Sequence, residues 1–253
     1  MVKNVFDDIV GTADVSRIDD VAVLMLRRER KLNALSSHME SELLRALSSP
    51  EVKSSRAVVV TGGDTVFSAG ADLTELRLMT TRDIVEYYRG SGRVYEEFPM
   101  LPQPTVAAIT GYCLGGGLEL ALAADLRIAD AAAVFGLPEI GIGILPSSGG
   151  LTRIVRAVGA GRASDLVLRG RRLNAQQAEQ WGIVTEISPP GCHVQCAIGI
   201  ARTLTEHSPL ALQITKRVLN VSFDAPKEAA LLLEQLSYAV LNDADEFVTS
   251  PEE

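Results

Sequence analysis

Residues 111–120, with the sequence GYCLGGGLEL, carry the strongest structural signal in this chain. They predict a strand, a glycine turn and the start of a helix. Glycines there let backbone N–H groups approach a ligand closely, because no Cβ is in the way. The helix N-terminus adds about half a positive charge, so the turn suits a phosphate or a developing oxyanion. A tight packing turn would use the same glycines, and both interpretations stay open here.

Strands and helices alternate on both sides of this turn as far as about residue 136, which predicts an α/β fold. Apolar runs predict the strands, and apolar residues on one helical face predict the helices. The predicted strands are residues 18–26, 57–60, 106–109, 126–128 and 134–135. The predicted helices are residues 36–47 with Ser36 as the N-cap, a long polar surface helix at 81–97, and 118–124.

From residue 150 onward the pattern becomes helical. The predicted helices are residues 151–158, 162–168, 175–181, 193–206, 210–221 and 227–241, with one short strand at 183–187. We therefore predict an α/β core over residues 1–190 and a helical C-terminal region over residues 191–253. Leu231, Leu232, Leu233 and Leu236 give that region apolar faces, which we expect to bury against another subunit.

Two acids lie in apolar surroundings. Glu119 is on the first turn of the helix after the glycines, and Glu139 follows a Phe-Gly-Leu-Pro sequence twenty residues later. The non-functional alternatives are an exposed acid stabilised by the helix dipole for Glu119 and a solvated loop acid for Glu139. Because carboxylates on apolar segments are unusual, the pair is also a candidate for acid/base catalysis. The helix N-terminus is expected to help keep Glu119 ionised.

Composition excludes several other classes of protein. The net charge of -8 disfavours a nucleic-acid partner, which needs a basic face. Apolar runs end well before the roughly 18 residues of a membrane span, and the N-terminus lacks the order of a signal peptide. Cys192, His193 and Cys196 lack a nearby fourth ligand, so we expect no metal. Three cysteines make no disulfide framework, and reduced thiols indicate a cytoplasmic protein.

Three blocks together resemble the crotonase (enoyl-CoA hydratase/isomerase) family: residues 67–73 (FSAGADL), 111–119 and 135–150. Further similarity lies at Asn33-Ala34-Leu35, at residues 158–159 and 178–184, and at residues 208–211. The resemblance runs from about residue 10 to about residue 220 with consistent spacing.

The resemblance implies a spiral of ββα turns followed by helices that build a homotrimer or homohexamer. It implies an acyl-CoA thioester as substrate, with coenzyme A as part of that substrate and no separate cofactor. The thioester oxygen would accept hydrogen bonds from the backbone N–H groups of Ala71 and Gly116. Family hydratases carry two glutamates, at the positions of Glu119 and Glu139, and this pair favours an enoyl-CoA hydratase of fatty acid metabolism. We expect Glu119 to act as the base toward water and Glu139 to supply the proton.

Coenzyme A needs cationic partners, which a chain of negative net charge must supply locally. Arg27, Arg28, Arg30 and Lys31 cluster just before Ala34, and we expect one or two of them, with Arg30 and Lys31 as candidates, to meet the phosphates. A solvated basic loop is the alternative for each. By resemblance, the backbone around Ala69, Asp72 and Leu73 forms the adenine and pantetheine side of the site, next to Ala34.

Two departures from the family pattern bear on function. Residues 146–153 have the sequence PSSGGLTR where family hydratases usually have PGAGGTQR, which leaves the acyl-chain preference open. The chain also stops at residues 250–253 where many relatives continue into a basic helix, which could alter CoA closure or the trimer contact.

The rival functions are a 3,2-enoyl-CoA isomerase and a non-catalytic acyl-CoA-binding paralogue. The sequence disfavours a serine hydrolase, because no Gly-x-Ser-x-Gly motif occurs and only three histidines are available.

Overall fold

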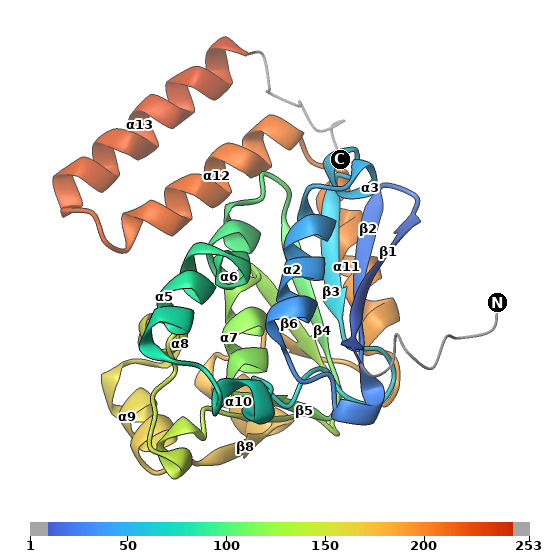
Figure 1. The fold of residues 1–253 in the computed structure, drawn as a ribbon. Helices are drawn as coiled ribbons and strands as arrows, with labels where there is room; N and C mark the ends of the chain where they lie inside the picture. Colours follow the sequence, from blue (N-terminus) through green and yellow to red (C-terminus); the bar gives the residue numbers. More distant parts are fainter. Residues whose placement is uncertain (1–9, 245–253) are drawn as a thin grey trace.

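Two β-sheets frame the protein, whose computed structural model describes residues 10–244 (Figure 1). The larger sheet has the strand order β1-β2-β3-β4-β6-β9 and the smaller one has the order β5-β7-β8. The larger sheet contains β1 (Thr12–Ile18), β2 (Val21–Arg27), β3 (Ala57–Thr61), β4 (Thr105–Ile109), β6 (Leu126–Ala129) and β9 (Glu186–Ile187). The smaller sheet contains β5 (Tyr112–Leu114), β7 (Val134–Gly136) and β8 (Arg172–Asn174). Only the β1–β2 and β7–β8 pairs are antiparallel among these strands.

The chain winds between the two sheets as a spiral. β4 belongs to the larger sheet and β5 to the smaller one, and α7 (Gly116–Ala123) follows before β6 and β7 repeat the step. Parallel bridges between Ser68 and Cys113 and between Leu35 and Ala71 extend the smaller wall to the preceding turns. Gly111 makes the sharp step from β4 to β5 at φ +58°, where a Cβ would lie 2.3 Å from the Thr65 carbonyl oxygen. The predicted α/β spiral of ββα turns is therefore present.

The larger sheet is covered on both faces, which explains why its parallel strands are apolar throughout. Successive side chains of β3 point to opposite faces. Val58 packs in the cluster that holds α2 (Ser37–Leu47), and Val59 packs in the cluster that holds α11 (His193–Thr205). In Figure 1, α2 and α11 lie on opposite sides of the strands. Ser36 caps α2 as predicted, because its Oγ accepts a hydrogen bond from the Met39 N–H at 3.2 Å.

The remaining helices connect the strands or follow them. The short ones are η1 (Glu29–Lys31), α3 (Pro50–Lys53), α4 (Leu73–Leu76), η2 (Ser91–Arg93), α6 (Val94–Glu97), η3 (Phe98–Met100) and η4 (Glu139–Ile142). The longer ones are α5 (Thr81–Arg89), α8 (Gly150–Val158), α9 (Ala160–Leu168), α10 (Ala175–Trp181), α12 (Pro209–Ser222) and α13 (Lys227–Asp243). Among residues 10–244, every helix is too short or too polar to cross a membrane.

Three predicted elements differ from the structure. The strand predicted at residues 18–26 is the second half of a hairpin, in which β1 and β2 meet at a turn where Asp19 has φ +53°. The helix predicted at residues 81–97 is broken after Arg89. Gly92 packs against the Tyr87 ring, where a Cβ would lie 2.9 Å from a ring carbon. This break turns Tyr95 into the core, with 3% of its surface exposed. Of the strand predicted at residues 183–187, only the last two residues form a strand, which is β9.

The C-terminal helices differ in how they pack. α11, the first helix beyond residue 190, packs its Ala197, Ile198 and Ala201 side chains against the larger sheet. α12 and α13 instead lie side by side outside the sheets, in orange and red in Figure 1. The proposed division at residue 190 stays a prediction, and the tail at residues 250–253 lies outside the described residues.

α12 and α13 expose large apolar side chains, and these predict a self-associating surface. The exposed residues are Leu219, Val221, Phe223, Leu231, Leu232, Leu236, Tyr238 and Val240. Exposed apolar clusters of this kind mark interaction sites, and we expect a trimer or a dimer of trimers in light scattering. The double variant Leu232→Glu/Leu236→Glu should shift the mass toward the monomer, whereas Gln235→Glu on the same helix should not. A monomeric wild-type protein would refute this expectation.

Candidate active site

One cavity of about 910 Å³ lies where five segments of the chain meet. The segments are residues 69–73, residues 75–95, the turn at Gly115 and Gly116, the stretch from η4 to residue 148, and one side of α2. Most of the wall is apolar, with Leu76, Met79, Ile84, Ile140, Ile142, Ile144 and Leu145 as the main side chains. Five acidic residues lie in this wall: Glu40, Asp72, Glu75, Glu119 and Glu139. A mainly apolar cavity with a few polar groups is typical of a small-molecule site.

Two backbone N–H groups, those of Ala71 and Gly116, lie close together at this cavity. A Cβ on Gly116 would lie 3.6 Å from the Ala71 nitrogen, and a Cβ on Gly70 would lie 3.4 Å from the Gly116 nitrogen. Ala71 is held by its parallel bridge to Leu35, in which its own N–H does not take part. Gly116 is the first residue of α7, so its N–H has no carbonyl partner within the helix. Both donors are therefore available to one oxygen atom of a ligand.

Glu119 is almost completely buried on the first turn of α7, with 4% of its surface exposed. Its Oε1 accepts hydrogen bonds from the backbone N–H groups of Ser148, at 2.7 Å, and Gly150, at 2.8 Å. Burial raises the pKa of Glu119, while these two donors and the charge of Arg153 oppose that rise. The expectation that the N-terminus of its own helix helps to keep Glu119 ionised stays a prediction. The groups that oppose the rise in its pKa are the two backbone N–H groups at residues 148 and 150 and the charge of Arg153.

Glu139 begins the η4 turn and points its carboxyl group toward the glycine turn. A Cβ on Gly115 would lie 3.1 Å from its Oε1, so a side chain at residue 115 would crowd the acid. Its Oε2 is buried and has no hydrogen-bond partner within residues 10–244. Burial, reinforced by the charge of Glu119, raises the pKa of Glu139 to about 7. A group of this pKa can give up or take a proton near neutral pH.

The unusual segment at residues 146–153 retains the features that Glu119 requires. Ser147 and Ser148 line the cavity, and the Ser148 N–H binds Glu119. Gly150 is essential, because a Cβ there would lie 2.7 Å from the Glu119 Oε1. Arg153 fixes the segment by donating hydrogen bonds to the Ser148 and Tyr95 carbonyl oxygens, at 2.9 Å and 2.6 Å. The two serines therefore alter the cavity wall while the support of Glu119 stays in place.

The structure brings most of the predicted site residues to this cavity. Its wall includes Ala69, Ala71, Asp72, Leu73, Gly116, Glu119 and Glu139, whereas Arg30, Lys31 and Ala34 are outside it. Arg30 and Lys31 are exposed in η1, and the Leu32 carbonyl beside them accepts a hydrogen bond from the Ala69 N–H at 2.9 Å. The basic loop therefore borders the segment at residues 69–73.

Asp72 and Arg28 have structural partners. Asp72 Oδ1 caps α4 through the Thr74 N–H, and Asp72 Oδ2 binds Arg28 Nη1 at 2.8 Å. Burial raises the pKa of Asp72, but the bonds from Arg28 and the cap outweigh it and lower the pKa overall. Arg28 is itself buried. The contacts of Asp72, of its neighbours and of the basic loop with CoA stay predictions.

The sequence analysis missed Glu40. It lies on α2 with only 2% of its surface exposed, and its carboxyl group contacts the hydroxyls of Tyr87, Tyr95 and Ser91. Burial raises its pKa to about 7, against the lowering effect of the three hydroxyls. A signal existed in the sequence, because Glu40 lies three residues before Leu43, on the apolar face of the predicted helix.

With this geometry in place, the comparisons with known proteins define the class. Residues 17–251 match the family described as Enoyl-CoA hydratase/isomerase. Two similar proteins are the 2,3-dehydroadipyl-CoA hydratase of Escherichia coli (strain K12), 37% identical over 90% of this chain and 89% of its own length, and the short-chain-enoyl-CoA hydratase of Clostridium acetobutylicum, 34% identical over 86% and 84%. The crystal structure of an enoyl-CoA hydratase from Thermoplasma volcanium GSS1 superposes with a TM-score of 0.87 at 32% identity, covering 95% of each chain.

The chain therefore belongs to the enoyl-CoA hydratase/isomerase family, which is the crotonase family of the sequence resemblance. It is a crotonase-family enzyme, and the two similar proteins named above are both called hydratases.

The basic loop yields a prediction about CoA. If Arg30 and Lys31 meet the phosphates, Arg30→Glu and Lys31→Glu should each weaken CoA binding about threefold to tenfold in calorimetry at low salt, as expected for exposed charge contacts. Arg45→Glu is the matched control, because Arg45 is a surface residue of α2 paired with Glu42. Unchanged CoA affinities in both variants would show that Arg30 and Lys31 do not contact the phosphates.

Proposed function

We propose that this enzyme adds water across the 2,3 double bond of a 2-enoyl-CoA thioester and forms a 3-hydroxyacyl-CoA. The observation that carries the proposal is that two carboxyl groups, Glu119 and Glu139, converge on the cavity that also holds the Ala71 and Gly116 N–H groups. Hydration needs a base for water, a proton for C2 and donors for the thioester oxygen. The pocket offers one candidate for each.

The N–H pair addresses the charge that develops during the reaction. When oxygen adds to C3, negative charge moves through C2 onto the thioester oxygen. The Ala71 and Gly116 N–H groups would stabilise this enolate-like state, and losing one such donor typically costs about 3 to 4 kcal/mol. Because both donors are backbone groups, they are fixed by the spiral and need no side-chain ordering.

The surroundings of the two acids support separate roles. Glu119 accepts two backbone hydrogen bonds, which favour its charged form and suit a base that takes a proton from water. Glu139 has an unpartnered oxygen and a pKa raised to about 7, which suit a protonated acid that delivers hydrogen to C2. Paired acids whose environments differ in this way divide into acid and base.

The relatives support the same reaction class. One is named a short-chain-enoyl-CoA hydratase and another a 2,3-dehydroadipyl-CoA hydratase. Their names give the same reaction on different acyl chains. We place the reaction in fatty acid or related acyl-CoA metabolism on this basis. A 3,2-enoyl-CoA isomerase is the second candidate, because one carboxyl group beside the N–H pair would suffice to move a proton.

Conservative removal of each acid tests the roles. Gln is nearly isosteric with Glu, so Glu119→Gln and Glu139→Gln should each lower kcat for hydration by about a hundred- to ten-thousand-fold. Binding of a saturated acyl-CoA should survive, because the N–H donors are unchanged. An isomerase that uses Glu139 alone would tolerate Glu119→Gln and would convert 3-enoyl-CoA. Loss of the conjugated thioester absorbance follows hydration, and full activity in both variants would overturn the proposal.

The two pKa shifts predict a bell-shaped dependence of kcat/KM on pH. Glu119 must be ionised, so the rate should fall in acid, at a pH above the usual range of a carboxyl group because burial raises its pKa. Glu139 must be protonated, so the rate should fall as pH rises through about 7. The residual activity of Glu139→Gln should lack the alkaline limb. Glu40→Gln should retain it, although Glu40 also has a pKa of about 7. An alkaline limb that persists in Glu139→Gln would contradict the assignment.

A further inference from the structure

One part of the wall of the 910 Å³ cavity is polar and has no role in the proposed hydration. Glu40 Oε1 accepts hydrogen bonds from the hydroxyls of Tyr87 and Tyr95, both at 2.9 Å, and Oε2 accepts one from Ser91 at 3.3 Å. Glu40, Tyr87 and Tyr95 all line the same cavity as Glu119 and Glu139. We call Glu40, Tyr87, Ser91 and Tyr95 the Glu40 cluster.

Stability alone does not account for this cluster. A buried carboxyl group loses its hydration, and replacing such a polar group and its partners by apolar side chains is often neutral or stabilising. The neighbouring positions on α2, Met39 and Leu43, are apolar core residues. An apolar side chain at residue 40 would continue the apolar wall of the cavity, as an ordinary alkyl chain requires. A carboxyl group at residue 40 therefore indicates a ligand with a polar group at this point of the cavity.

The cluster borders the reacting end of the cavity. A Cβ on Gly116 would lie 3.1 Å from the Tyr95 hydroxyl oxygen, so this hydroxyl is next to the N–H pair. On the other side, Tyr87 lines the same cavity wall as Ser148, whose backbone N–H donates a hydrogen bond to Glu119 at 2.7 Å. The Glu40 cluster therefore lies next to the N–H pair, within reach of an acyl chain whose thioester oxygen is bound there.

The cluster can accept one more hydrogen bond. A carboxylate has about four acceptor sites on its two oxygens. Oε1 has two donors and Oε2 has one long bond to Ser91. The remaining site on Oε2 can bind a donor on the ligand, and each tyrosine oxygen can also accept.

The charge around the cluster decides which polar group fits. The cavity wall already holds Glu75, Glu119 and Glu139, and the charge of Glu75 adds to the rise in the pKa of Glu40. A carboxylate on the acyl chain would meet these like charges, whereas a neutral hydroxyl would not.

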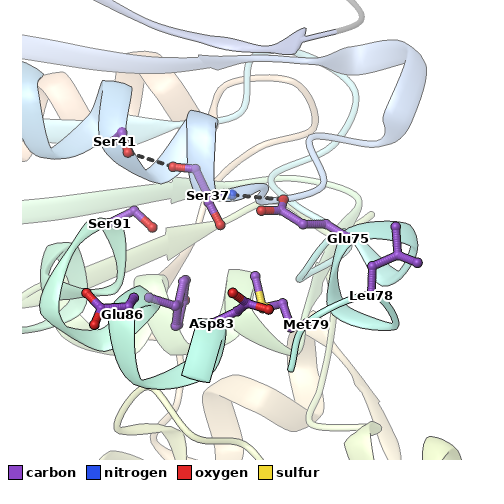
Figure 2. A pocket seen from close by; sticks show the side chains of 9 residues that line it. Ser37, Ser41, Glu75, Leu78, Met79, Asp83, Glu86 and Ser91 are labelled. Carbon is purple, nitrogen blue, oxygen red and sulfur yellow. Dashed lines mark hydrogen bonds between the residues drawn. The ribbon is translucent and has the colours of Figure 1, made fainter. Parts of the chain in front are cut away.

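Room for a polar chain end exists behind the cluster. A second cavity of about 430 Å³ shares Ser37, Glu75, Met79 and Tyr87 with the first. Figure 2 shows it between α2 and α5, ringed by Ser37, Ser41, Ser91, Glu75, Asp83 and Glu86. Its hydroxyls can bind a neutral polar group, and its acids add further negative charge against an anionic one.

We propose that the Glu40 cluster is a specificity subsite that selects acyl-CoA ligands whose acyl chain carries a neutral hydrogen-bond donor, such as a hydroxyl, beyond C3. The subsite deepens the proposed hydratase function, on which its role in substrate choice rests. It also separates this protein from its relative named for a dehydroadipyl substrate, because the acidic wall opposes a free carboxylate on the acyl chain.

Binding of saturated acyl-CoA ligands tests the subsite without any turnover. Hexanoyl-CoA, 6-hydroxyhexanoyl-CoA and adipoyl-CoA have six-carbon chains and differ only in the terminal group. At about pH 8, where Glu40 is mostly ionised, calorimetry on the wild-type protein should give about tenfold tighter binding of the hydroxylated ligand than of hexanoyl-CoA, as for one hydrogen bond to a charged group. Adipoyl-CoA should bind most weakly.

Substitutions at residue 40 should change the relative affinities for these ligands. Glu40→Leu should favour hexanoyl-CoA over the hydroxylated ligand, and Glu40→Gln should shrink the hydroxyl preference and strengthen adipoyl-CoA binding by removing a charge. Glu42→Leu is the matched control on the same helix, where Glu42 pairs with Arg45 outside the cavity. It should keep the wild-type order. Thermal unfolding checks each variant, and Glu40→Gln carries the test if Glu40→Leu does not fold.

The outcomes separate the subsite from the reaction. A wild-type protein that binds hexanoyl-CoA as tightly as 6-hydroxyhexanoyl-CoA overturns the subsite, even if it hydrates hex-2-enoyl-CoA. Affinity ratios between the three ligands that stay unchanged in Glu40→Gln overturn it as well. A hydroxyl preference that Glu40→Gln removes, in a protein that hydrates no 2-enoyl-CoA, supports the subsite and overturns the hydratase proposal.

Discussion

The close approach of two backbone segments, at Gly70-Ala71 and at Gly115-Gly116, is the constraint on which the rest of the site depends. A Cβ on Gly70 would lie 2.8 Å from the Leu114 carbonyl oxygen, so a side chain there would push the segments apart. The approach places two N–H groups on one point of the cavity. It also sets the start of α7, and therefore the position of Glu119. The spiral supplies this contact, because successive turns bridge along the smaller wall at Leu35, Ser68 and Cys113.

Burial then determines what the acids can do. Glu40, Glu119 and Glu139 all have raised pKa values, and loss of water is the largest cause for each. Their partners differ: hydroxyls for Glu40, backbone N–H groups for Glu119, and an unpartnered oxygen for Glu139. Three carboxyl groups in one cavity can therefore have three roles, because the donors around each carboxyl group set how readily it carries a charge.

Much of this arrangement was predictable from the sequence, because local signals define it. The glycine turn and the two acids on apolar segments pointed to the site, and the family resemblance assigned Ala71 and Gly116 to the N–H pair. The Glu40 cluster was not predictable in the same way. It depends on the break after Arg89, which Gly92 makes possible by packing on Tyr87 and which brings Tyr95 into the core. Such a contact between α2 and residues 87–95 is tertiary, and helical periodicity carries no information on it.

The central claim is that this cavity directs water to C3 of a 2-enoyl thioester. The most direct measurement is mass spectrometry of the product after wild-type protein is incubated with a 2-enoyl-CoA in H₂¹⁸O. The account predicts a 3-hydroxyacyl-CoA that carries one ¹⁸O atom at C3. Recovery of unlabelled 2-enoyl-CoA alone, or its conversion to a 3-enoyl isomer without label, would contradict it.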